Sequence, residues 1–303
     1  SKSTVEGVEE ESYFFKLSKW QNSLLKFFDD NPNFILPETR KNEVVSFVKS
    51  GLKDLSVSRK SFSWGIKVPS NNEHIIYVWL DALTNYLSAL NFPDDKDKKY
   101  IDFWPASVHL IGKDILRFHA VYWPAFLLAA GIKPPKRIFS HGWILSGEEK
   151  MSKSKGNILD PIEIIDQYGL DPLRYYLIKE VSFGNDGNIS QEKLEDCINS
   201  DLANNFGNLC QRVTAFAIKN CEGTIPKTIE FNQDDLKILD KFKTNLDLIR
   251  DKIDKQDINF YIDFIVNSLF DANKYFNDEE PWKKKDDISR LNTIVYTSLE
   301  IIR

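Results

Sequence analysis

Cysteine is scarce in this sequence, and its placement excludes two kinds of stabilisation. The three cysteines, Cys197, Cys210 and Cys221, form no Cys-x-x-Cys pair. Such a pair is the usual element of a cysteine zinc site, and a disulfide framework needs a larger, even set of cysteines. We therefore expect buried thiols and no metal site, and zinc is not supported by the residues present.

Long apolar runs are also missing. No stretch approaches the roughly 20 consecutive apolar residues of a membrane-spanning helix. The polar, acidic start at residues 1–12 lacks the charged-then-apolar order of a signal peptide. We expect no membrane partner and a cytoplasmic location, with the mitochondrial matrix as the alternative. The sequence leaves the oligomeric state open.

An excess of positive charge is absent as well. Lysine and arginine together number 40 against 45 aspartates and glutamates, which gives a net charge of -5. A nonspecific nucleic-acid binder would normally be basic overall, so any contact with RNA must be local. The basic patches, each of which is more often a solvated surface, are residues 133–137, Lys150 with Lys153 and Lys155, and residues 283–285.

The apolar pattern of the first half predicts an α/β fold. The 303 residues, 42% of them hydrophobic, suffice for two or three domains. Residues 1–56 show helical spacing, interrupted at Pro37. Beyond Ser58, expected strands alternate with expected helices, a pattern typical of a parallel sheet covered by helices. The strands are expected at 75–80, 108–112 and 137–141, and the helices at 82–90 and 114–131.

The pattern of the second half is helical. A polar loop after Gly142 leads into two expected helices that open with Asp160-Pro161 and Asp171-Pro172. Aspartate is a favoured N-cap, and proline is favoured at the first helical position. From Ser190 onward, helical segments of about 20 residues follow one another, which predicts an antiparallel bundle. The segments are separated near Gly223, Gln256 and Pro281.

One short motif carries chemistry. Residues 150–154 read Lys-Met-Ser-Lys-Ser and are followed by Lys-Gly-Asn. This motif resembles the KMSKS signature of class I aminoacyl-tRNA synthetases in every position, the alternative being a solvated basic loop. Ammonium groups on such a loop stabilise the charge that develops on pyrophosphate when an amino-acid carboxylate attacks ATP. We therefore predict Lys150 and Lys153 as catalytic residues.

The second signature of that family, HIGH, is not found in its expected setting. Residues 109–112 read His-Leu-Ile-Gly, but they lie in an expected strand just before Lys113. In the family, HIGH opens a helix after the first strand. The resemblance therefore implies the C-terminal two-thirds of an enzyme, without its N-terminal HIGH-containing half. We expect this segment alone to be inactive.

Two clusters narrow the resemblance to methionyl-tRNA synthetases. In the first, at 78–86, we expect a strand to end at Trp79; in the second, Ile115, His119 and Trp123 are spaced as one helical stripe. Aromatic side chains suit an unbranched thioether, although such a stripe is otherwise simply core. The resemblance implies a methionine-binding pocket formed by Trp79, Ala82, Leu83, Tyr86, Ile115, His119 and Trp123.

The same resemblance implies a site for ATP with Mg²⁺. Gly112 and Asp114 follow an expected parallel strand, at the place where open α/β sheets bind nucleotides. In the family, the matching aspartate faces the ribose, and the segment that matches residues 141–144 borders adenine. The ATP-binding residues implied are Gly112, Asp114, His141, Gly142, Ile144, Lys150 and Lys153.

The helical part resembles the anticodon-binding helices of the same family. Asn208 and Arg212 match its Asn-Leu-x-x-Arg sequence, and Trp282 matches its Pro-Trp. Such side chains read unpaired bases by hydrogen bonding and stacking. The asparagine and arginine could equally form a surface hydrogen bond, and the tryptophan could be a packing residue. The resemblance implies tRNA(Met) as a partner beside methionine and ATP.

The resemblance covers essentially the whole chain and sets the expected domains. The expected activity is that of a methionine–tRNA ligase. The alternatives are another class I synthetase, for leucine, isoleucine, valine or cysteine, and a catalytically inactive tRNA-binding fragment. The domains are the end of a connective insertion at 1–56, the second half of a Rossmann-like catalytic domain at 57–143, a KMSKS loop and stem-contact region at 144–204, and an all-α anticodon-binding helix bundle at 205–303.

Overall fold

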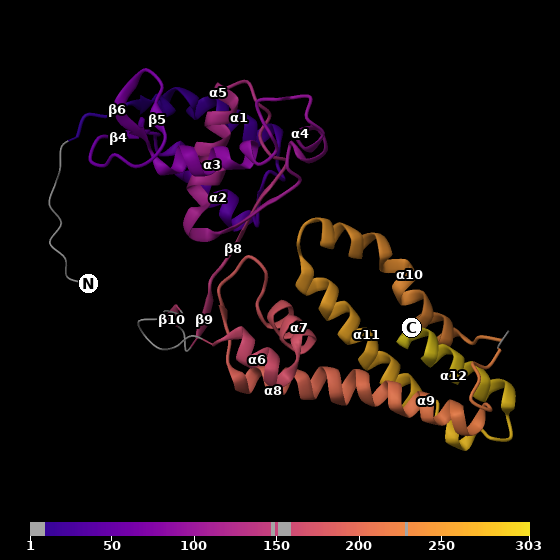
Figure 1. Cartoon of the computed structure of the whole chain (residues 1–303). Coiled ribbons are helices and arrows are strands. Elements are labelled where there is room, and N and C mark those ends of the chain that lie inside the picture. Colours follow the sequence, from indigo (N-terminus) through magenta and orange to yellow (C-terminus); the bar gives the residue numbers. More distant parts are fainter. Residues whose placement is uncertain (1–9, 147–148, 151–158, 228–229) are drawn as a thin grey trace. The chain divides into compact units, whose positions relative to one another are not determined.

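The computed structural model describes residues 10–146, 149–150, 159–227 and 230–303, with only the backbone of residues 149–150. Figure 1 shows short strands and helices in the first part of the chain and long helices in the last. The chain divides into two compact units, Ser1–His141 and Gly142–Arg303. Each unit has its own buried hydrophobic clusters.

The first unit combines short strands with helices. Its helices are α1 Gln21–Asp30, α2 Glu38–Lys49, α3 Val78–Ser88, α4 Lys98–Phe103 and α5 Trp123–Ala129, with 3-10 turns at Leu17–Trp20 and Lys113–Ile115 and a π-helical turn at Phe118–Tyr122. Its strands are β1 Phe14–Phe15, β2 Ile35–Leu36, β3 Leu55–Ser56, β4 Ser58–Arg59, β5 Lys67–Val68, β6 Asn71–Ile76, β7 His109–Gly112 and β8 Ile138–His141.

A parallel sheet in the order β2, β8, β7 lies in this unit. The register of β7 on β8 runs from His109 opposite Ile138 to Gly112 opposite His141. The expected strands at 108–112 and 137–141 are therefore confirmed as parallel neighbours. Their carboxyl ends lie at the same edge of the sheet, so Gly112 and His141 are brought together there.

The prediction of a strand at 75–80 is wrong about where the strand ends and about the strands with which it pairs. β6 stops at Ile76 and pairs antiparallel with β4 and β5, outside the parallel sheet. The helix begins at Val78, after the extended residue Tyr77, so Trp79 lies in the first turn of α3. A short apolar run fits a strand or a buried helix equally well, and Asp81 in the first turn favours a helix start there.

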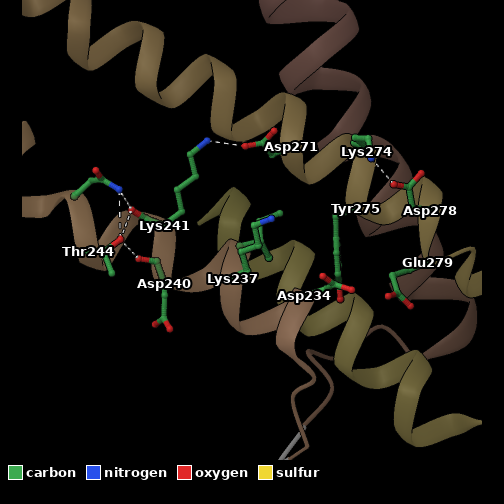
Figure 2. Close-up of a pocket in the computed structure, with 12 residues that line it drawn as sticks. Asp234, Lys237, Asp240, Lys241, Thr244, Asp271, Lys274, Tyr275, Asp278 and Glu279 are labelled. Atoms are coloured by element: carbon green, nitrogen blue, oxygen red, sulfur yellow. Dashed lines mark hydrogen bonds and ion pairs between the residues drawn. The ribbon is translucent and has the colours of Figure 1, made fainter.

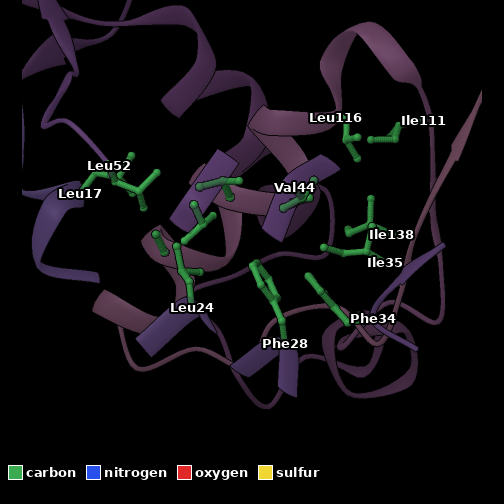
Figure 3. Close-up of a cluster of buried hydrophobic side chains, with 14 residues drawn as sticks. Leu17, Leu24, Phe28, Phe34, Ile35, Val44, Leu52, Ile111, Leu116 and Ile138 are labelled. Atoms are coloured by element: carbon green, nitrogen blue, oxygen red, sulfur yellow. The ribbon is translucent and has the colours of Figure 1, made fainter. Parts of the chain in front are cut away.

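The first 56 residues are less helical than expected, because Phe14–Phe15 and Leu55–Ser56 pair as the strands β1 and β3. Figure 3 shows that α1 and α2 do not build a core alone, since Phe28 and Val44 pack in one cluster with Ile138 of the parallel sheet. The buried members of this cluster are Leu17, Leu24, Phe28, Phe34, Ile35, Val44, Val48, Leu52, Ile111, Leu116, Ala120, Val121, Ala125 and Ile138.

The helix expected over 114–131 is interrupted. A 3-10 turn at Lys113–Ile115 and a π-helical turn at Phe118–Tyr122 precede α5. A π-helical turn inserts a residue and changes the face on which later side chains lie. As a result, Ile115 packs against the cluster of Figure 3, whereas Trp123 belongs to a second cluster with Leu83. The expected single stripe of Ile115, His119 and Trp123 is therefore wrong.

The second unit contains a small sheet and the long helices. Its strands are β9 Ile144–Ser146, β10 Glu149–Lys150 and β11 Gly187–Asn188. Its helices are α6 Pro161–Tyr168, α7 Leu170–Glu180, α8 Gln191–Cys197, α9 Asn208–Asn220, α10 Gln233–Asp254, α11 Ile258–Asp278 and α12 Ile288–Ile302, with a π-helical segment at Ile198–Gly207 and a 3-10 turn at Pro281–Lys283.

The two expected Asp-Pro helix starts have different outcomes. Asp160 is the N-cap of α6, and its side chain accepts a hydrogen bond from the backbone N–H of Ile162 at 2.8 Å, as predicted. Asp171 is not a cap, because α7 already begins at Leu170. Gly169 ends one helix and starts the next with a φ of 92°, a left-handed conformation that favours glycine.

The bundle of α9 to α12 is confirmed, with its breaks near the predicted residues. Gly223 and Gln256 both have positive φ values, 68° and 60°, and they lie where α9 and α10 have ended. The buried apolar residues that hold the helices together are Leu209, Val213, Ile238, Leu269, Ala272, Tyr275, Phe276 and Ile294.

A buried carboxylate also joins three helices of the bundle. Asp235 is fully buried on α10, and it accepts hydrogen bonds from Arg290 at 2.5 and 3.0 Å and from the hydroxyl of Tyr275 at 2.5 Å. Burial alone would raise the pKa of Asp235, but the hydrogen bonds from Arg290 and Tyr275 hold it below its usual value. The carboxylate is therefore charged in the folded protein at neutral pH.

The cysteines are free thiols. Cys197 and Cys221 are buried, as predicted, and Cys210 is only partly so. Burial raises the pKa of all three, that of Cys197 to about 11. Because the thiolate is the reactive form, these groups are inert at neutral pH.

Candidate functional site

The carboxyl ends of β7 and β8 bring three predicted ATP-binding residues together. Gly112 lies opposite His141 in the register, and Asp114 follows two residues later. A Cβ added to Gly112 would lie 2.8 Å from a carboxylate oxygen of Asp114 and 3.9 Å from Cε1 of His141. The glycine therefore allows the carboxylate to fold back over the strand end. This edge is where parallel sheets bind nucleotides.

An aromatic cluster lies between α3 and the π-helical turn. Trp79 stacks on Phe118 with ring centroids 3.7 Å apart and an angle of 14° between the planes. Tyr86 lies 5.7 Å from the ring of His119 and 6.3 Å from that of Trp123. The structure thus brings together four of the predicted methionine-binding side chains, and it adds Phe118.

The hydrogen bonds of His119 define its tautomer. Its Nδ1 lies 3.0 Å from the carbonyl oxygen of Ile115, and its Nε2 lies 3.0 Å from the hydroxyl oxygen of Tyr86. A carbonyl can only accept, so Nδ1 carries the proton, Nε2 accepts, and Tyr86 donates. Burial lowers the pKa of His119 and raises the pKa of Tyr86. Both side chains are therefore uncharged at neutral pH.

Three other predicted pocket residues lie differently. Leu83 is buried in a hydrophobic cluster with Leu87 and Trp123, so its side chain packs the interior. Ala82 is exposed four residues before Tyr86, on the same face of α3, but its small side chain is not part of the ring contacts. Ile115 reaches His119 through its backbone carbonyl, while its side chain packs in the cluster of Figure 3.

His109 belongs to the same aromatic cluster, although the sequence analysis assigned no binding role to this residue. It stacks on Tyr86 with centroids 4.2 Å apart and planes at 29°. Burial, and to a smaller degree His119, lowers the pKa of His109 to about 4. The sequence signal was its position at the start of a strand that ends in Gly112. Its contact with α3 depends on tertiary packing that no local pattern reveals.

In the second unit, Gly142 lies just before β9, where the backbone at Asn185 passes very close to it. A Cβ added to Gly142 would lie 2.2 Å from the backbone of Asn185, so no other residue fits there. The neighbouring Trp143 donates its backbone N–H to the carboxylate of Asp186 at 2.9 Å. The predicted residue Ile144 begins β9, which pairs with β10 and with β11.

The structure describes the side chain of neither predicted catalytic lysine. The backbone of Lys150 pairs with Leu145 in β10. Lys153 lies outside the described residues. Their catalytic roles stay predictions.

Two of the three predicted anticodon-binding residues, Arg212 and Trp282, are linked through the end of α11. Arg212 on α9 donates to the side-chain oxygen of Asn277 at 2.5 Å and lies over the ring of Phe276 at 5.5 Å. Trp282 meets the same ring edge-on, with centroids 6.2 Å apart, and is 41% exposed. Asn208 is exposed at the start of α9. Arg212 and Trp282 therefore lie around one aromatic ring, and the tryptophan keeps surface for a ligand.

A separate groove of about 700 Å³ lies between α10 and α11. Figure 2 shows two ion pairs there, Lys241 with Asp271 at 2.6 Å and Lys274 with Asp278 at 2.8 Å. The groove includes none of the predicted anticodon residues, and five carboxylates line it against three lysines, so its net charge is negative. It is lined by Asp234, Lys237, Ile238, Asp240, Lys241, Thr244, Asn245, Asp271, Lys274, Tyr275, Asp278 and Glu279.

Two kinds of feature are absent from the described part of the chain. No group of three or more histidine, cysteine, aspartate or glutamate side chains is arranged to hold a metal ion within residues 10–146, 149–150, 159–227 and 230–303. Within the same ranges, the helices are too short or too polar to cross a membrane.

Comparison with known protein families gives one match that covers most of the chain. The model described as tRNA synthetases class I (M) matches residues 1–214. The match therefore includes the parallel sheet, the aromatic cluster, the KMSKS segment and the start of α9.

Curated relatives resemble the chain over nearly its whole length. The methionine–tRNA ligase of Brucella suis biovar 1 (strain 1330) is 51% identical over 300 residues, which are 99% of this chain and 58% of the relative. The methionine–tRNA ligase of Rickettsia felis is 52% identical over 303 residues, 99% of this chain and 59% of the relative. The chain thus spans less than two thirds of the length of these relatives.

Solved structures of methionyl-tRNA synthetases are also similar to this chain. The Mycobacterium tuberculosis methionyl-tRNA synthetase in complex with methionyl-adenylate has a TM-score of 0.91 at 47% identity, covering 97% of this chain and 59% of that one. The apo form of the same enzyme has a TM-score of 0.89 at 44% identity, with the same coverage.

Proposed function

The chain belongs to the class I tRNA synthetases, in their methionyl family, and we propose on this premise that it forms part of an enzyme that joins methionine to tRNA(Met). The enzyme would first condense methionine with ATP to methionyl-adenylate and then transfer the methionyl group to the tRNA. The observation that carries the proposal is the uncharged aromatic cluster in which Tyr86 donates a hydrogen bond to His119.

This cluster suits the side chain of methionine. A thioether is apolar and polarisable, and it gains from contact with aromatic rings. The rings of Trp79, Tyr86, Phe118 and His119 supply such contacts without a charged group among them. Tyr86 is 36% exposed, so one side of the cluster is accessible to a ligand. A site of this kind would disfavour charged amino acids, whose burial without a partner is costly.

The proposed nucleotide-binding residues of the first unit are Gly112, Asp114 and His141. They lie together at the edge of the parallel sheet where such folds bind nucleotides. The carboxylate of Asp114 is an acceptor that suits the hydroxyl groups of a ribose. From the second unit, we propose that Gly142 and Ile144 border the base and that Lys150 and Lys153 stabilise charge on the departing pyrophosphate. The ATP would carry Mg²⁺.

We further propose that Asn208, Arg212 and Trp282 read the anticodon. The exposed indole of Trp282 offers a stacking surface for an unpaired base, and Arg212 supplies several donors beside it. Phe276 supports both side chains from the interior of the bundle.

The length of the relatives bears on the activity of this segment. Because the chain covers only 58% and 59% of two methionine–tRNA ligases, we propose that activity needs the further sequence that such enzymes contain. Residues 1–303 alone would then bind ligands weakly and catalyse no activation. Assays of activity should use the longest natural form of the protein that carries this chain.

The proposal is tested by the affinities for methionine and for ATP, measured separately by isothermal titration. His119→Ala and Tyr86→Ala should weaken methionine binding on the order of tenfold or more and leave ATP binding nearly unchanged, because neither residue lies at the nucleotide edge. His74→Ala is a matched control, since His74 is a buried histidine whose contacts are with Ser58 and Tyr13 and not with the aromatic cluster. Equal losses for both ligands in the His119 and Tyr86 variants would mean that these residues only support the core.

A further inference from the structure

His109 lies in the interior of the aromatic cluster, and nothing above gives it a function. It is the first residue of β7, and its backbone N–H donates to the carbonyl of Arg137 at 2.8 Å. Its side chain is 6% exposed. A buried ring on a strand paired over its full length has a fixed position, so His109 can act as a support for whatever packs against it.

The partner with the closest ring is Tyr86. The two rings are stacked, with centroids 4.2 Å apart. On its other sides His109 meets Trp104 at 6.1 Å and His119 at 6.3 Å, the latter nearly edge-on at 83°. Trp104 is itself held by a hydrogen bond from its Nε1 to the carbonyl of Lys133 at 3.1 Å. His109 thus lies between an anchored tryptophan and the tyrosine of the proposed pocket.

Two contacts define where the ring of Tyr86 can lie. One is the hydrogen bond from its hydroxyl to Nε2 of His119, and the other is the stacking face of His109. The hydrogen bond fixes the tip of the side chain but allows the ring to rotate about its own axis. A flat neighbour restricts that rotation, because offset stacking favours near-parallel planes.

The imidazole is an unusual choice for a purely structural position. Nδ1 of His109 is buried without a hydrogen-bond partner among the described residues. Burial of an unpaired polar atom destabilises the folded state, whereas an apolar ring or a leucine would fill the space without that cost. The nitrogens of His109 therefore add nothing to the stability of the fold, and the feature that accounts for its place is the flat face that it presents to Tyr86.

We propose that His109 is a positioning residue for amino-acid recognition. Its ring holds the ring of Tyr86 in the orientation in which the Tyr86 hydroxyl donates its hydrogen bond to His119. The proposal rests on the proposed function, because it assigns Tyr86 and His119 to the methionine pocket. His109 would not touch ATP, and it would act on methionine through Tyr86. The loss of its flat ring should therefore change the KM for methionine and leave kcat and the KM for ATP unchanged.

The test uses two substitutions in the longest natural form of the protein, with methionine-dependent pyrophosphate exchange as the assay. His109→Leu fills the space without a flat ring, and His109→Phe keeps the ring without its nitrogens. H109L should raise the KM for methionine on the order of tenfold, the scale of one aromatic contact, with kcat and the KM for ATP within about twofold. H109F should restore most of the methionine KM.

A second readout does not depend on catalysis. The ¹⁵N chemical shifts of His119 report which ring nitrogen carries the proton and whether the other accepts a hydrogen bond. In H109L the Nε2 signal should move toward that of a free acceptor, while in H109F it should stay near that of the wild type. The control H74A, at another buried histidine, should lower thermal stability without moving this signal or the ratio of the two KM values.

The possible failures are distinguishable. If the wild type shows no methionine-dependent exchange, the proposed function fails. If the wild type is active and folded H109L keeps the wild-type KM and the wild-type His119 signal, the positioning role is refuted. If H109F and H109L raise the KM equally while both stay folded, the flat ring is not what matters, and the inference is likewise overturned.

Discussion

The substitution Trp282→Ala distinguishes a role of Trp282 in packing the bundle from a role in recognising the anticodon. The residue precedes α12 in a 3-10 turn, and its ring touches the bundle mainly through the edge-on contact with Phe276. Its indole is 41% exposed. The substitution therefore removes a large aromatic surface that is only partly used by the fold.

The expected magnitudes follow from these contacts. One edge-on aromatic pair contributes about 1 kcal/mol, so the loss in free energy of unfolding should be small beside the cost of removing a buried tryptophan, roughly 3–5 kcal/mol. One base stacked on an aromatic side chain contributes about 1–3 kcal/mol to binding. That range corresponds to roughly 5- to 150-fold in the efficiency of tRNA charging.

The assay compares charging of a transcript with a CAU anticodon and of one with a single altered anticodon base, beside methionyl-adenylate formation without tRNA. The wild type should discriminate strongly between the transcripts and the variant much less, with adenylate formation close to normal. Phe270→Ala serves as a matched control, because Phe270 is a half-exposed aromatic residue on α11. It should leave discrimination intact.

A W282A protein that loses thermal stability and adenylate formation together would contradict the anticodon assignment. Trp282 would then be a packing residue, and the anticodon assignment of Arg212 and Asn208 would lose its main support. Retention of full anticodon discrimination by a stable W282A protein would contradict the assignment equally clearly.

Three further predictions concern the motif and the buried carboxylate of the bundle. Lys153→Ala should lower the rate of methionine activation on the order of 10²-fold or more while leaving methionine affinity nearly unchanged, because its charge would act mainly on the transition state; a change confined to affinity would refute that role. Arg290→Met should lower the free energy of unfolding by about 3 kcal/mol in denaturant titration, since it leaves Asp235 buried without its ion pair; a loss below about 0.5 kcal/mol, the scale of an ordinary surface substitution, would contradict the assigned burial. The folded-state pKa of Asp235 lies below its usual value. The contribution of its carboxylate to the free energy of unfolding is therefore complete above the unfolded pKa of about 4 and is lost as the pH falls through the folded pKa. Asp235→Asn should accordingly weaken the dependence of the free energy of unfolding on acid pH.

The parts of the fold that the sequence predicts well are those with local signals. The N-cap at Asp160 and the helix breaks near Gly223 and Gln256 follow from side-chain capping and from residues with positive φ. The strands β7 and β8 are short apolar runs bounded by polar segments. The second helix start was misplaced by two residues, because α7 begins at Leu170, after its N-cap Gly169, and Asp171 already lies inside the helix.

The features that the sequence could not reveal depend on tertiary packing. Apolar spacing cannot decide whether Trp79 ends a strand or begins a helix, and it cannot reveal the π-helical turn at Phe118–Tyr122. The turn matters for the site, since it separates Ile115 from Trp123. The family resemblance named Tyr86 and His119, but their hydrogen bond became evident only from the three-dimensional arrangement. The contact of Tyr86 with His109 was equally hidden in the sequence.

The measurement that tests the central claim most directly is amino-acid-dependent ATP–pyrophosphate exchange by the longest natural form of the protein that carries this chain. We predict exchange with methionine and little or none with leucine, isoleucine, valine or cysteine, and no exchange by residues 1–303 alone. Exchange driven best by one of the other four amino acids would contradict the assignment of the aromatic cluster to methionine. No exchange with any of the five would favour a tRNA-binding protein without catalytic activity.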